Sequence, residues 1–213
     1  MKAFDVTVPP GFVRFDLPLS DEAGVRHLVA SAASGAPSRR LSTFAGGLHT
    51  TLLAAFEHLT ENGCFLVFMA APNSMLGMAQ PMISFRRMEQ DVASDPLAGL
   101  LSLAAKDPTS ELLDIAPAVC LRSSQVNELD LDTELARASD ELDLFDRDGR
   151  SEQFVVVRVQ CAYTIGVPGE PDSWYQAVCV ANVPSLRDEP AEPTDVIQMF
   201  DSILSTFRWL DDA

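Results

Sequence analysis

The sequence predicts an α+β protein in which helices pack on a single, mainly antiparallel sheet. Strand-like segments are joined by short turn-forming stretches at 72–74 and 167–172, which is typical of antiparallel hairpins. Parallel crossover units require a helix between successive strands, whereas helical periodicity in this sequence does not alternate with every strand. The chain has 213 residues, of which 47% are hydrophobic, so it can bury a sizeable core. We expect one domain over residues 1–213.

The first third of the chain is expected to contain a strand followed by two helices. Residues 4–17 indicate an opening strand or a hairpin around Pro9-Pro10-Gly11. Ser20 is expected to cap a helix that runs to about residue 33. The strongest helical pattern covers residues 40–61 and ends at Asn62-Gly63. Its apolar stripe is expected to pack on the sheet and contains Leu41, Phe44, Leu48, Leu52, Ala55, Phe56 and Leu59.

The middle of the chain is expected to contain three strands, a short helix and a loop. Residues 64–71 and 76–88 predict an antiparallel pair of strands. Asp95 should cap a short helix that begins at Pro96. Residues 112–122 are expected to form one more strand. Residues at about 127–152 predict a solvated acidic loop, because this segment contains ten carboxylates and only three arginines.

The clearest hairpin is predicted from residues 154–165 and 173–183. A turn centred near Glu170 would give both strands the same apolar face and would place Cys161 opposite Cys179. We expect two reduced thiols there, with a strained disulfide as the alternative. A last helix, capped by Thr194, should bury residues at helical spacing, namely Val196, Phe200, Ile203, Phe207 and Leu210.

Charge and cysteine usage limit the possible partners and the compartment. Thirty-one acidic residues against fifteen basic ones give a net charge of −16, which repels nucleic acids and anionic membrane surfaces. The sequence contains no apolar run long enough to cross a bilayer, so we expect no membrane insertion. The four cysteines lie apart at 64, 120, 161 and 179 and indicate free thiols of a reducing compartment. We therefore expect a cytoplasmic protein.

The search for catalytic, metal and cofactor motifs favours a non-enzymatic protein. The three histidines, His27, His49 and His58, do not have metal-ligand spacing, and His49 and His58 fall on opposite sides of the predicted helix. No nucleophile elbow or phosphate-binding glycine loop occurs. Residues 143–152 do not align with a calcium loop. The cysteines sit among apolar neighbours, which makes a thiol inert. We expect no metal and no cofactor.

Two groups of residues remain as candidates for binding. The acidic loop could meet a basic partner through Glu128, Asp130, Asp132 and Glu134. The polar face of the predicted hairpin is the second group, beside Trp174. Its side chains either hydrogen-bond to one another, which we favour, or line a pocket or an interface. They are Arg158, Gln160, Thr164, Gln176 and Asn182.

Three segments resemble a known superfamily. They are VTVPPGFVRFDLPLS near the start, LLDIAPAVCLR in the middle and VIQMFDSILSTFRWLD at the end. Together they are similar to small actinobacterial proteins of the superfamily that contains PsbP and the nuclear-import protein Mog. The residues that carry the resemblance include Pro10 to Phe12, without the family's spacer residue, and Phe200 to Arg208. The resemblance implies an α/β/α sandwich that serves in binding or assembly.

The leading functional hypothesis is therefore a non-enzymatic protein that binds another protein. Some relatives are encoded beside type VII secretion genes, so the resemblance implies an accessory or chaperone-like role. Many relatives are exported lipoproteins, whereas this sequence shows neither an export signal nor an anchoring cysteine. The alternative is a small-ligand binder or enzyme with a pocket between sheet and helices, using Arg158, Gln160 and Gln176 as polar contacts.

Overall fold

The structure is a computed structural model that describes residues 3–34, 41–74, 76, 79–89, 96–115, 118–129, 154–186 and 192–210. Within these residues a seven-stranded sheet has the order β2-β3-β4-β8-β7-β6-β5, and every neighbouring pair is antiparallel. The α+β fold with a mainly antiparallel sheet is thus confirmed. The strands are β2 (Phe12–Asp16), β3 (Cys64–Ala70), β4 (Met82–Glu89), β5 (Ser110–Ile115), β6 (Ala118–Leu129), β7 (Phe154–Val167) and β8 (Glu170–Leu186).

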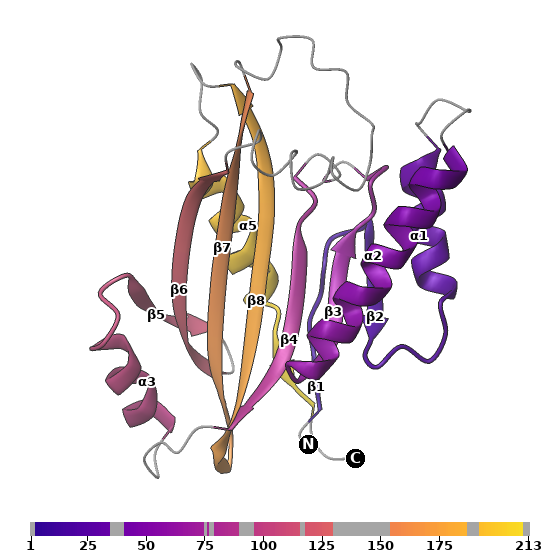
Figure 1. Cartoon of the computed structure of the whole chain (residues 1–213). Coiled ribbons are helices and arrows are strands. Elements are labelled where there is room, and N and C mark those ends of the chain that lie inside the picture. The colour runs from indigo at the N-terminus through magenta and orange to yellow at the C-terminus, as the bar shows by residue number, and fades with distance from the viewer. Residues whose placement is uncertain are drawn as a thin grey trace.

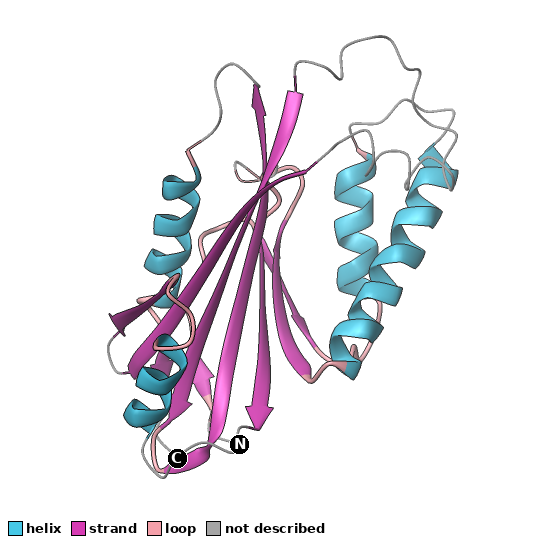
Figure 2. Cartoon of the chain, turned by 60° about the vertical axis from the view of Figure 1, so that its left-hand side comes forward, coloured by secondary structure: helices cyan, strands magenta, loops and turns pink. Residues whose placement is uncertain are grey.

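Helices cover both faces of this sheet. Helices α1 (Ala23–Ala33) and α2 (Leu41–Glu61) lie side by side over one edge, whereas α5 (Pro193–Leu204) crosses the opposite face (Figures 1 and 2). Helix α3 (Pro96–Ala104) packs on the same face as the α1–α2 pair, near the other edge. No helix in the described part of the chain is long and apolar enough to cross a membrane.

The larger core lies between the sheet and α5. It is built from alternate residues of the central strands, because successive side chains of a strand point to opposite faces. Phe200 and Leu204 of α5 are fully buried against Cys161, Tyr163 and other residues of this sheet face. Burial of this size is the main favourable contribution to folding.

The other sheet face carries two smaller cores with polar residues between them. Phe15, Val67 and Phe56 form the first core together with α1. Trp174 and Leu121 form the second under α3. Between these cores the strands β4, β7 and β8 carry polar residues that are half-buried or buried.

The β7–β8 hairpin forms as the alternation predicts. Cys161 lies opposite Cys179, and their face is buried in the larger core. Both thiols are free in this structure. Helix α2 also ends where predicted, because Gly63 adopts a φ of 76°, which a residue with a Cβ rarely adopts.

The opening segment is not a hairpin. Its first part, β1 (Phe4–Asp5), pairs with β9 (Arg208–Trp209) near the other end of the chain, and only β2 joins the large sheet. Phe4 stacks on Phe207 with ring centroids 4.9 Å apart, and Thr206 Oγ1 accepts a hydrogen bond from the Thr7 amide. These contacts between distant segments outweigh local pairing.

Several predicted boundaries are also wrong. Residues 112–122 are two strands, β5 and β6, rather than one. Strand β6 continues to Leu129, so residues 127–129 belong to the sheet and not to the acidic loop. Strand β4 begins at Met82 rather than at residue 76, because the preceding segment turns and Gln80 has a φ of 42°.

The helix starts and two apolar positions also differ from expectation. Neither Ser20 nor Thr194 is an N-cap; those positions are Glu22 and Glu192. The amide of Ala23 instead donates to the side chain of Asp21, at 2.7 Å. Two residues assigned to apolar stripes are exposed, namely Ala55 and Leu210. The predicted cap Asp95 lies outside the described residues.

Candidate functional site

A cavity of about 550 Å³ lies between the α1–α2 pair and the sheet. Pockets that hold small molecules have volumes of about 300 to 1,000 Å³ and mostly apolar walls. Most of the residues that line this cavity are apolar, and they come from both helices, from β3, β4 and β8, and from the turn before β4. They are Leu28, Ala32, Leu48, Leu52, Met69, Ala70, Pro72, Pro81, Met82 and Val180, joined by Gln80, Arg158 and Asn182.

The two helices pack on the β2–β3 edge of the sheet, and the cavity lies between them and the neighbouring strands. Phe56 and Val67 anchor the helix pair to β3 in the smaller core. Two backbone hydrogen bonds hold the turn before β4 against the sheet, from the amide of Asn182 to Ala79 and from the amide of Ala70 to Pro81, each 2.9 Å. One rim of the cavity is therefore fixed by main-chain contacts.

Arg158 and Asn182 are cross-strand neighbours on β7 and β8, and both line the cavity. The Nε of Arg158 donates to Oδ1 of Asn182 at 3.0 Å. No carboxylate among the described residues lies within ion-pair distance of Arg158. Asn182 accepts this bond with its oxygen, and its side-chain NH2 group is a further hydrogen-bond donor. The polar end of the cavity thus presents hydrogen-bond donors and a positive charge.

The other polar residues of this sheet face are placed apart from the cavity. Gln176 accepts a hydrogen bond of 2.8 Å from Nε of Arg86, and Thr164 is buried beside it in the register. Gln160 lies on β7 opposite Val180 and is not among the residues that line the cavity. The structure therefore brings together Arg158 and Asn182, and it pairs Gln176 with Arg86.

Trp174 is completely buried, with 0% of its surface exposed, against Leu100 of α3 and Leu121 of β6. The sequence makes Trp174 a candidate for binding because it lies beside the polar face of the hairpin. The position under α3 makes it part of a core. Its indole Nε1 has no hydrogen-bond partner among the described residues.

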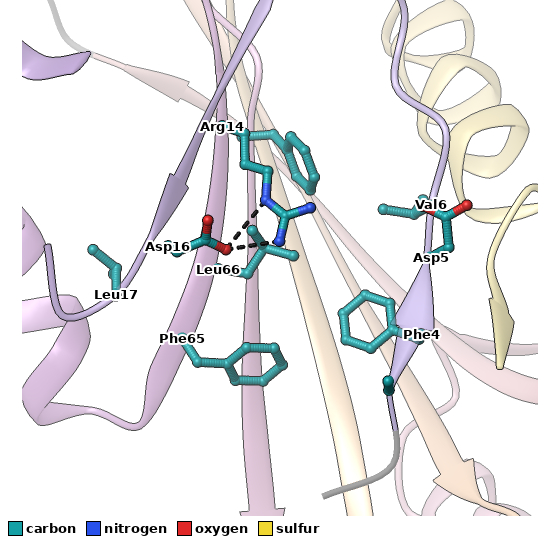
Figure 3. Close-up of a pocket in the computed structure, with 10 residues that line it drawn as sticks. Phe4, Asp5, Val6, Arg14, Asp16, Leu17, Phe65 and Leu66 are labelled. Atoms are coloured by element: carbon teal, nitrogen blue, oxygen red, sulfur yellow. Dashed lines mark hydrogen bonds and ion pairs between the residues drawn. The ribbon is translucent and has the colours of Figure 1, made fainter. Parts of the chain in front are cut away.

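A second cavity, of about 300 Å³, opens on the face covered by α5, between β1 and the β2–β3 pair. Figure 3 shows Phe4 and Phe65 on its two sides and Arg14 bonded to Asp16 at its rim. Asp5 is likewise paired, with Arg208 at 2.7 Å. Because its charged side chains already have partners, this cavity offers a ligand fewer uncommitted polar groups than the first.

The acidic candidates are mostly outside the described residues. Glu128 is the exception: it lies on β6, is exposed, and pairs in the register with Val157. Asp130, Asp132 and Glu134 are not described. Glu128 thus stands on a regular strand rather than in a loop.

The histidines and cysteines form no reactive cluster in the part of the chain that is described. No group of three or more metal-ligating side chains occurs there. His27 and His58 are exposed, and His49 lies 3.3 Å from a carboxylate oxygen of Glu22. Burial raises the pKa of Cys120 to about 12 and that of Cys161 to about 11, so these thiols stay protonated at neutral pH.

One partly buried polar network escaped the sequence analysis. The hydroxyl of Tyr163 donates to Oδ1 of Asp201 on α5 at 2.8 Å, and Arg122 on β6 bonds to Oδ2 of the same carboxylate. Arg122 also bonds to Glu111 on β5. Burial is the main cause that raises the pKa of Tyr163, which therefore remains a hydrogen-bond donor. A sequence signal did exist, because Asp201 interrupts the apolar residues of the last helix.

Comparisons with known proteins assign no family to the chain. No family model matches the sequence, and no curated protein matches it. Among solved structures, the chain is similar to a protein from Bacteroides thetaiotaomicron whose crystal structure was determined at 1.50 Å resolution, with 11% sequence identity and a TM-score of 0.36. The similarity covers 70% of this chain and 40% of that protein, so the chain spans about two fifths of its length.

Proposed function

We propose that this protein is a non-enzymatic binding protein that holds a small, largely apolar molecule between the α1–α2 pair and the sheet. The cavity of about 550 Å³ carries this proposal. Of the two functions that the sequence leaves open, a protein binder and a small-ligand binder, it favours the second. The described residues around it include no nucleophile activated by a base, so binding requires no chemical step.

A neutral fluorescent dye tests this proposal. Nile red should bind the purified protein and gain fluorescence, because its emission rises in apolar surroundings. Ala32→Trp places a large side chain in the cavity and should weaken dye binding about tenfold or more, since the bound volume is lost.

Leu101→Trp is the matched control. Leu101 is half-exposed on α3 and does not line the cavity, so this variant should bind the dye as the wild type does. Thermal unfolding of both variants verifies that they are folded. Equal dye binding by the two tryptophan variants, or no binding by the wild type, would contradict the proposal.

We propose further that the fold is related to the PsbP and Mog superfamily and that the protein is cytoplasmic. An antiparallel sheet with helices on both faces supports the first statement. Four buried free cysteines support the second, since such thiols persist in reducing compartments. Cell fractionation tests the location, and recovery of the protein in an exported fraction would contradict it.

A protein partner for the acidic residues remains the second proposal, including the accessory role that the resemblance implies. It is supported by the net charge of −16 and by the exposed Glu128. A pull-down with the wild type and with a variant neutralised at Glu128, Asp130, Asp132 and Glu134 tests it. Equal recovery of a partner by both proteins would show that these four acidic residues do not contribute to the interaction.

A further inference from the structure

We propose that the ligand of the α1–α2 cavity carries one carboxylate on an aliphatic body, and that Arg158 with Asn182 binds this carboxylate. The inference rests on the proposed function, because it names the chemical class of the molecule held there. Three features of the cavity support it: a positive charge with no carboxylate partner among the described residues, a guanidinium held by Asn182, and an adaptable apolar wall.

The charge at this place is the first argument. The protein has about twice as many acidic as basic residues, yet no described carboxylate pairs with Arg158. A half-buried cation beside apolar walls loses hydration, and an anion that enters the cavity compensates for this loss. By contrast, Arg14, Arg122 and Arg208 each have a carboxylate partner. The positive charge of Arg158 is therefore available to a ligand, whereas the charges of these three arginines already have carboxylate partners.

The orientation of the guanidinium is the second argument. Its Nε is bound to Oδ1 of Asn182, and both residues are fixed in the register of the long β7–β8 hairpin. The two terminal nitrogens of Arg158 form the parallel donor pair that matches the two oxygens of a carboxylate. The amide nitrogen of Asn182 adds a third donor of the same kind. Binding then requires little ordering of side chains, which favours affinity.

The apolar wall is the third argument. Leu28, Leu48 and Leu52 come from the helices, whereas Met69 and Met82 come from the sheet. Leucine and methionine side chains adapt to an aliphatic chain, and methionine in particular fills irregular space. The wall contains no aromatic side chain among the residues described as lining the cavity. An aliphatic body therefore fits this lining better than a stacked ring does.

Competition with Nile red tests the inference. Decanoate and decanol share one apolar chain and differ in the head group, so their difference in affinity measures recognition of the carboxylate. At neutral pH and low salt, decanoate should displace the dye from the wild type at a concentration about tenfold lower than decanol, as expected for a charge-assisted bond of about 1.5 kcal/mol. High salt should reduce this preference.

Arg158→Gln should abolish the preference for decanoate while retaining binding of the neutral dye and of decanol. Arg86→Gln is the matched control, because Arg86 lies on the same sheet face, bonds to Gln176 and does not line the cavity. This variant should keep the preference. Equal displacement by both compounds, or an unchanged preference in Arg158→Gln, would overturn the inference while the cavity remains a binding site. No dye binding by the wild type would overturn the proposed function itself.

Discussion

Replacing Tyr163 with phenylalanine should destabilise the protein when Asp201 is present and should not destabilise it when Asp201 is absent. In the wild type the change removes the 2.8 Å hydrogen bond from the Tyr163 hydroxyl to Asp201. A hydrogen bond to a charged group contributes about 1.5 to 3 kcal/mol, and the Asp201 side chain is 31% exposed, so water replaces part of it. We expect Tyr163→Phe to lower the free energy of unfolding by about 1 to 2 kcal/mol.

In Asp201→Ala the same substitution should be neutral or stabilising. The Tyr163 side chain is completely buried, and the loss of Asp201 leaves its hydroxyl without the acceptor that the structure shows. An unsatisfied buried hydroxyl destabilises a protein by about 1 to 3 kcal/mol, which phenylalanine relieves. Asp201→Ala alone should destabilise more than Tyr163→Phe, because it also separates Arg122 from one of its two carboxylate partners.

Urea denaturation of the four proteins, followed by tryptophan fluorescence and circular dichroism, measures the two effects in one cycle. The coupling energy between Tyr163 and Asp201 should be about 2 kcal/mol. An equal cost of Tyr163→Phe in both backgrounds would refute the reasoning, since the hydroxyl would then gain nothing from the carboxylate. Equal slopes of the unfolding curves verify that the unfolded states are comparable.

Three further predictions concern local features. Gly46→Ala should stabilise the protein by about 0.5 to 1 kcal/mol, because this helix position has open space, whereas Gly63→Ala should destabilise it by about 1 kcal/mol through its φ of 76°; thermal unfolding distinguishes the two signs. Hydrogen bonds, chiefly from Thr109, lower the pKa of Asp107 from 3.8 to about 2. Its stabilisation relative to Asp107→Asn should therefore be complete above about pH 4 and disappear as the pH falls to about 2; urea unfolding across this range and an NMR titration measure it. The Cys161 thiol, with its pKa raised to about 11 by burial, should react with a thiol reagent only after unfolding, and rapid labelling of the native protein at neutral pH would contradict this.

Local sequence patterns were sufficient for the elements whose environment repeats along the chain. Alternation over β7 and β8 predicted their register, because a slip of one residue would turn every apolar side chain away from the core. Helical spacing predicted α2, and Gly63 predicted its end. The same alternation predicted the polar face of β7 and β8, and it placed Arg158 and Asn182 together on that face.

Contacts between distant segments were decided only in three dimensions. Phe4 joins Phe207 and Trp209 across almost the whole chain, and the Arg122 and Tyr163 side chains meet at Asp201 of α5. No local pattern carries this information, because the partners are chosen by which surfaces remain to be buried once the sheet has formed.

The sequence by itself determined the fold class, the β7–β8 register and the polar character of the face that carries Arg158. The tertiary structure decided that α3 buries Trp174, that Gln176 bonds to Arg86, and that the α1–α2 pair leaves space beside Arg158 and Asn182. The physical reason is that alternation and helical spacing are properties of neighbouring residues, whereas a cavity depends on how separately formed layers are seated on one another.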